Sequence, residues 1–187
     1  MNKLVIVFAL FLFACKNRER VFVSVKDSTK PIAISHGYLL FNSVKHPFSE
    51  PDRLDSFVIA VTGDSLLHAA VRFEIFDPAG KSIYLDTFPA MHLAGSYDEE
   101  SLNSPVKKEN FIRKRVRDFF SADKFLEPAV SAADSTDDDY TQDKALWSDL
   151  KSNPRSIGFF YLLGEEDGRK IAYSRLKKKV LMYFNCC

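Results

Sequence analysis

Residues 67–88, LHAAVRFEIFDPAGKSIYLDTF, hold two strand-like segments on either side of a tight turn. Leu67 to Phe76 and Ser82 to Phe88 are rich in the apolar, aromatic and β-branched residues that suit a half-buried pleated surface. Between them, the turn Asp77-Pro78-Ala79-Gly80 supplies a proline, which fixes φ near about −65°, and a glycine, which tolerates positive φ. The stretch therefore predicts an antiparallel β-hairpin.

The rest of the chain predicts more strands of the same kind. Turn residues at 62–65 and 164–168 favour further hairpins, and Pro47 and Pro51 favour a loop over 45–53. The segments predicted as strands are 21–25, 32–41, 57–61, 156–163 and 170–184.

Two amphipathic helices are predicted in the second half of the chain. Ser104 suits an N-cap and Pro105 the first helical position. Helical spacing then gives one apolar face, made of Phe111, Ile112, Val116, Phe119 and Phe120. A shorter helix over 141–151 buries Leu146, Trp147 and Leu150. We therefore expect a single globular domain over residues 21–187 with an α+β fold, in which two helices pack on an antiparallel sheet built from hairpins.

The first residues of the chain have the pattern of an export signal. Lys3 precedes an unbroken apolar run over residues 4–14, which is too short for the about 20 residues that a membrane span needs, and Cys15 follows at once. The alternative is a core helix or strand that happens to end in a cysteine.

The segment Leu12-Phe13-Ala14-Cys15 resembles the lipobox of bacterial lipoproteins. The resemblance implies that residues 1–14 are a signal peptide and that residues 15–20 are a short tether. It also implies that the thiol of Cys15 carries diacylglycerol and that the protein carries further acyl chains such as palmitate. Lys16, at a position where aspartate marks inner-membrane retention, implies the outer membrane, with the domain in the periplasm or on the cell surface.

The composition limits the partners. With 26 Lys and Arg against 25 Asp and Glu, the formal net charge is +1, which argues against nucleic acid. The 17 Phe residues predict a large core, or the lining of a ligand groove.

Two groups of residues are candidates for function. Six cations between 107 and 117 could contact an anionic surface or a polyanion such as lipopolysaccharide. The alternative is that they form the solvated side of a helix. The five residues assigned to an anionic contact are Lys107, Lys108, Arg113, Lys114 and Arg117. Cys186 and Cys187 could form a vicinal disulfide, pair between molecules, serve in redox chemistry, or stay reduced.

The carboxylates favour no metal or catalytic site. The acidic loop over 127–143 departs from the EF-hand pattern, since Gln142 stands where counting from Asp137 requires glycine. The loop is therefore interpreted as solvated, and an irregular calcium site is the alternative. Glu165, Glu166 and Asp167 fall in a predicted turn, and the four histidines lack ligand spacing. We therefore expect no metal and no cofactor.

These observations favour a non-catalytic envelope module, not an enzyme, that recognises a protein or glycan partner. One alternative is a carrier that holds a lipid or other hydrophobic ligand in an apolar cavity. The other is a hydrolase whose site is assembled only by folding.

Overall fold

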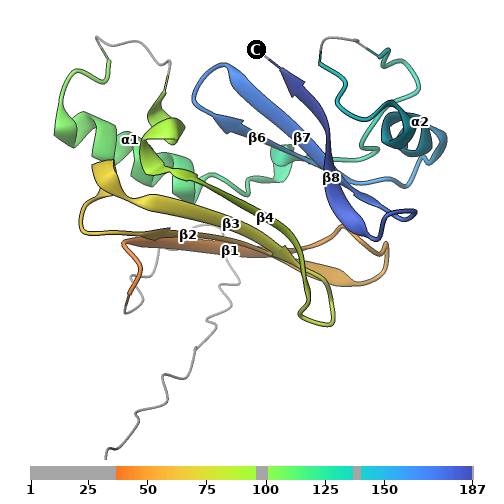
Figure 1. Cartoon of the computed structure of the whole chain (residues 1–187), viewed down its shortest axis with the longest axis horizontal. Helices are drawn as coiled ribbons and strands as arrows, with labels where there is room; N and C mark the ends of the chain where they lie inside the picture. The colour runs from red at the N-terminus through yellow and green to blue at the C-terminus, as the bar shows by residue number, and fades with distance from the viewer. Residues whose placement is uncertain (1–36, 96–100, 137–139, 187) are drawn as a thin grey trace, which may run out of the picture.

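The computed structural model describes residues 37–95, 101–136 and 140–186, and within them it places two helices and two antiparallel sheets (Figure 1). The first sheet has the order β1 (Leu40–Pro47), β2 (Leu54–Thr62), β3 (Ala70–Phe76), β4 (Ser82–Pro89). The second has the order β5 (Phe125–Leu126), β6 (Gly158–Leu163), β7 (Asp167–Ser174), β8 (Lys179–Cys186). The helices are α1 (Pro105–Arg117) and α2 (Lys144–Ser152).

This arrangement confirms the α+β class, with hairpin-built antiparallel strands and two helices. The strands divide between two sheets, a division that the sequence pattern does not reveal. The predicted signal peptide, the tether and the strand over 21–25 lie outside the described residues.

The hairpin at 77–80 is confirmed. The N–H of Gly80 donates to the carbonyl of Asp77 over 2.8 Å, and Gly80 has the positive φ of +83° that the turn requires. The Asp77 carboxylate also accepts from the backbone N–H groups of Ala79 and Lys81, each at 2.9 Å. The turn is therefore closed by both the backbone and the aspartate side chain.

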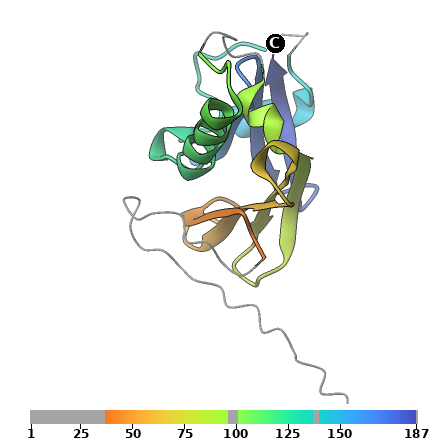
Figure 2. The same ribbon diagram turned by 90° about the vertical axis from the view of Figure 1, so that its left-hand side faces the viewer.

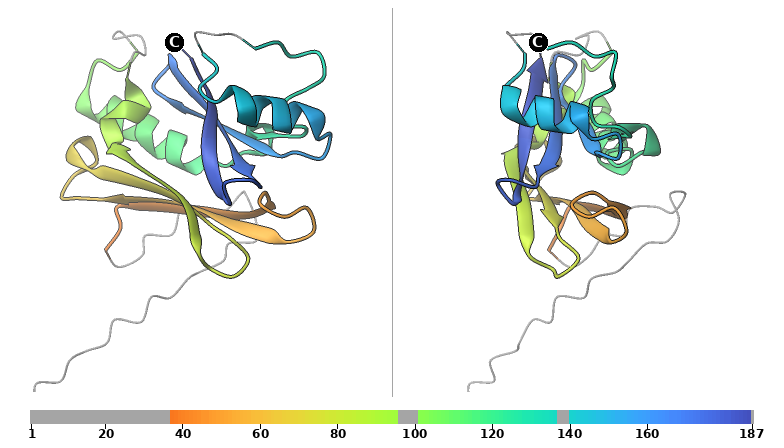
Figure 3. Two further views of the ribbon diagram at one scale, coloured as in Figure 1. Left: turned by 45° about the vertical axis from the view of Figure 1, so that its right-hand side comes forward. Right: turned by 90° about the vertical axis from the view of Figure 1, so that its right-hand side faces the viewer.

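One face of the first sheet forms the floor of the core. Phe57, Ile59, Phe73 and Ile75 alternate inward along β2 and β3 and are fully buried. Helix α1 and the second sheet lie side by side over this face (Figures 1 and 3). Because buried residues of both belong to the same hydrophobic cluster, they share one core with the first sheet.

Helix α2 covers the opposite face of the second sheet, away from the first sheet, as the turned views show (Figures 2 and 3). Leu146, Trp147 and Leu150 are buried there, as predicted, against Ala172 and Tyr183. The helix begins at Lys144 and not at 141, because Asp143 is the N-cap and its side chain accepts from the N–H of Leu146 over 2.9 Å.

Several predicted strand boundaries are wrong. The segment 170–184 is two strands, β7 and β8, joined by a turn over 175–178 in which Lys178 has a φ of +50°. The loop predicted from residue 45 begins later, because β1 continues to Pro47, at a sheet edge where proline is tolerated. The strand predicted from Leu67 begins at Ala70, after a 3₁₀ turn at Leu66–His68.

Helix α1 begins as predicted and ends earlier. The Ser104 hydroxyl accepts from the N–H of Lys107 over 3.3 Å, which confirms the N-cap. Phe119 and Phe120 follow the helix instead of lying on its apolar face, although both are buried in the core. Among the described residues, neither helix is long and apolar enough to cross a bilayer.

Candidate functional site

An open groove lies between α1 and β6. Its volume is about 370 Å³, within the range of roughly 300–1,000 Å³ that is usual for ligand sites. Its lining comes from the second half of α1, the segment after it and the second half of β6: Phe111, Lys114, Arg115, Asp118, Phe119, Ser121, Asp123, Lys124, Tyr161 and Leu162.

The groove exists because β5 is short. Strand β5 pairs only with Gly158 and Phe159, so the rest of β6 has no neighbouring strand on this side and faces α1. Arg115 reaches across from the helix and donates through Nη2 to the carbonyl of Leu162 over 2.8 Å. This contact fixes the distance between the helix and the strand edge.

The floor of the groove is aromatic. Phe119 and Tyr161 are buried, with ring centroids 5.8 Å apart, and both belong to the core between the two sheets. Phe111 lies on the helix and is half-buried. A bound group would therefore contact rigid rings that the core already holds in place.

The rim of the groove carries charges of both signs, and its carboxylates already have partners. The pKa of Asp123 is lowered, first by a hydrogen bond from the Ser121 side chain and also by Lys124, whose Nζ lies 3.4 Å from the carboxylate. Asp118 accepts from Nε of Arg117 over 3.0 Å. Lys114 is exposed and forms no ion pair with any described residue. The rim therefore favours a ligand with negative charge.

The structure places the five predicted cations in different surroundings. Lys107, Arg113, Lys114 and Arg117 are exposed, and Lys108 is half-buried. Of these five residues, only Lys114 lines the groove. Arg115 lines it too; the sequence analysis counted Arg115 among the six cations but did not assign it to an anionic contact. Apart from Arg117, no member of the set is in an ion pair within the described residues.

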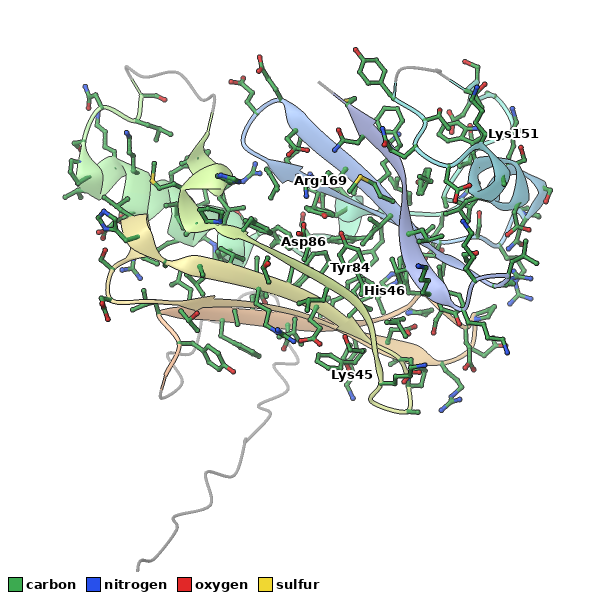
Figure 4. All side chains as sticks on the ribbon, in the orientation of Figure 1. Lys45, His46, Tyr84, Asp86, Lys151 and Arg169 are labelled. Carbon is green, nitrogen blue, oxygen red and sulfur yellow. The ribbon has the colours of Figure 1, made fainter. Side chains whose placement is uncertain are left out.

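Outside the groove, a polar cluster lies where β4 meets the second sheet. Figure 4 labels three of its members, Tyr84, Asp86 and Arg169. Asp86 accepts from the hydroxyl of Tyr161 over 2.9 Å and from Nη1 of Arg169 over 3.0 Å. The hydroxyls of Tyr84 and Tyr161 are 2.7 Å apart. Arg169 also forms a two-pronged pair with Asp167, at 2.8 and 2.7 Å.

The protonation states in this cluster are stable near neutral pH. Burial raises the pKa of Tyr84 to about 12 and also raises the pKa of Tyr161. Hydrogen bonds to Asp167 raise the pKa of Arg169, and the same bonds lower the pKa of Asp167. The cluster thus ties the two sheets together, and each of these four pKa shifts favours the protonation state that the group already has at neutral pH.

The sequence analysis missed this cluster. Asp86 and Arg169 are 83 residues apart, and neither belongs to a motif. The available signal was the alternation along β4, which places Tyr84 and Asp86 on the same face as the buried Phe88. Polar residues at inward positions require partners, so this pattern could have predicted a buried polar contact.

Three of the carboxylates in the predicted acidic loop and turn have separate structural roles, and Asp137 lies outside the described residues. Asp134 accepts from the N–H of Ser131, Asp143 caps α2, and Asp167 pairs with Arg169. Among the residues that the structure describes, no group of three or more His, Cys, Asp or Glu side chains is arranged to hold a metal ion. Cys186 is half-buried at the end of β8, and Cys187 lies outside the described residues, so their disulfide and redox chemistry stays a prediction.

Comparison of the chain with models of known families, with curated proteins and with solved structures finds no match. The fold and the groove are therefore the basis for a functional proposal.

Proposed function

We propose that this protein is a lipid-anchored, non-catalytic interaction module of the cell envelope. In this proposal the acyl chains on Cys15 hold it to a membrane, and the groove between α1 and β6 binds an anionic group of a protein or glycan partner. The observation that carries the proposal is the combination of a rigid aromatic floor with the exposed Lys114, which forms no ion pair with a described residue. Recognition sites commonly join apolar contact area to a few polar groups that fix orientation.

The use of phenylalanine in the structure supports this proposal over a carrier. Phe159 has the rings of Phe57, Phe73 and Phe125 around it, with centroids 5.0 to 5.6 Å away. Phe119 and Phe120 extend the same cluster from the segment after α1. Because these rings contact one another, they fill the space between the sheets where a lipid carrier would enclose its ligand.

Site-specific photo-crosslinking in the native membrane tests the binding site. A photoreactive residue in place of Asp118, which lines the groove, should form a discrete adduct with a partner. The same residue in place of Lys178, in the exposed β7–β8 turn, serves as the control and should not. Adding Lys114→Glu should abolish the adduct at 118, whereas Lys81→Glu, an equal charge change in an exposed turn, should not.

Two results would contradict the proposal. An adduct pattern that is the same at 118 and 178 would mean that the groove is not the contact site. An intact mass without acyl chains on Cys15 would refute the anchor.

A further inference from the structure

We infer that the outward face of α1 docks on anionic phospholipid headgroups of the membrane that holds the protein, which orients the domain with α1 against the bilayer. The inference rests on the proposed anchor at Cys15. We define the basic face as Val106, Lys107, Arg113, Lys114 and Arg117, all of which are exposed.

The first argument is charge complementarity. The chain as a whole has a formal charge of only +1, yet this one helix face presents four cations. Three of them, Lys107, Arg113 and Lys114, form no ion pair with a described residue. The exposed pair of Arg117 with Asp118 costs little to exchange for a headgroup, since surface pairs are weak.

The second argument is an exposed apolar side chain at the start of the same face. Val106 is 68% exposed, among the most exposed large apolar side chains of the described residues. It follows Pro105 at the first turn of the helix, where it can enter the apolar side of the headgroup region when the cations contact phosphate.

The third argument is the length of chain between the anchor and the domain. Residues 16–36 can span at most roughly 75 Å, at about 3.6 Å per residue, so the covalent chain permits α1 to reach the bilayer. Covalent anchoring at Cys15 also gives α1 an effective concentration near the membrane in the millimolar range. A contact too weak to recruit a free protein is therefore well populated in an anchored one.

Amine labelling of the lipidated full-length protein in vesicles tests the inference. The vesicles are phosphatidylcholine alone or with about one third phosphatidylglycerol. Lys107 and Lys114 report the basic face, and Lys81 and Lys178, which are exposed in turns, report the rest of the surface. We expect labelling of the two helix lysines to fall at least fivefold on anionic vesicles only, and to recover in 0.5 M salt, where screening is strong.

A pair of variants with the same charge change provides the control. Arg113→Gln with Arg117→Gln should restore most of the labelling, because each cation near an anionic leaflet strengthens binding roughly fivefold. Arg53→Gln with Arg155→Gln removes two exposed arginines outside the helix and should leave the protection unchanged.

Each outcome has one meaning. If Cys15 carries acyl chains but Lys107 and Lys114 are not protected, the docking is refuted and the anchor is not. If the intact mass lacks the acyl chains, both the anchor and the docking are refuted. Protection on neutral vesicles that appears only when soluble polyphosphate is added overturns the inference in favour of a soluble polyanion.

Discussion

Truncation of Phe159 tests whether the two sheets and α1 share a single core. Phe159 is fully buried on β6, and the rings around it come from both sheets and from the segment after α1. A buried Phe→Ala change usually costs about 3–5 kcal/mol, and aromatic pairs add roughly 0.5–1.5 kcal/mol to their burial. We therefore expect Phe159→Ala to lower the free energy of unfolding by about 4 kcal/mol.

The neighbouring residue provides a matched control. Phe160 points to the opposite face of β6, is half-buried, and has Nζ of Lys124 5.2 Å from its ring centroid. An exposed cation–π contact is worth about 0.5–1 kcal/mol, so Phe160→Ala should cost only about 1 kcal/mol. The two variants remove the same atoms from adjacent positions of one strand.

Urea unfolding followed by far-UV circular dichroism measures the difference. With an m-value of about 2 kcal/mol/M, the Phe159 variant should unfold at a urea concentration about 2 M lower than the wild type. Its transition should stay single, because one core unfolds as one unit. Equal losses in the two variants, or a second transition that does not move in Phe159→Ala, would refute the shared core.

Three further predictions concern the contacts that hold the domain together. Arg169→Gln should destabilise by about 2 kcal/mol because it removes the cation from the half-buried carboxylates of Asp86 and Asp167, whereas Arg72→Gln, which breaks an ion pair whose arginine is 53% exposed, should cost under about 1 kcal/mol in the same urea assay. Gly164→Ala should lower the melting temperature more than Gly80→Ala: both have positive φ, but a Cβ at 164 would lie 2.6 Å from the carbonyl oxygen of Gly95 and one at 80 would meet open space. Asp143→Ala should cost about 1 kcal/mol of unfolding free energy at pH 7. Hydrogen bonds from the Leu146 N–H and from Lys177 lower the pKa of Asp143, so the stability difference between wild type and variant should shrink as the pH falls below the ordinary carboxyl range. A stability difference that stays constant down to pH 2 would contradict the cap.

Local turn chemistry explains which parts of the fold the sequence could predict. The turn at 77–80 has its proline and glycine where the backbone needs them, and the hairpin is confirmed. The turn between β7 and β8 has the sequence Arg175-Leu176-Lys177-Lys178, without glycine or proline, so 170–184 looked like one strand. Its positive φ at Lys178 is set by the pairing of the two strands, which the local sequence does not encode.

The candidate site was harder to predict because its parts are far apart in the chain. The cations of α1 were recognised from their spacing, but the groove also depends on the length of β5 and on the contact from Arg115 to Leu162, 47 residues away. The polar cluster similarly joins β4 to β7 across 83 residues. Alternation along a strand predicts which side chains point inward, and only the packing of the two sheets decides which of them meet.

The near-neutral charge of the chain makes the anchor and the basic face depend on each other. At distances beyond the Debye length, about 8 Å at physiological ionic strength, a molecule with a formal charge of +1 feels little attraction to an anionic surface. Within that distance, the exposed Lys107, Arg113 and Lys114, which form no ion pair with a described residue, can attract an anionic surface. In the proposed arrangement, therefore, the lipid anchor on Cys15 and not long-range electrostatics brings the domain to the membrane, and the basic face only selects an orientation. The docking should accordingly be lost from a protein that lacks its acyl chains, even though every residue of the basic face is still present.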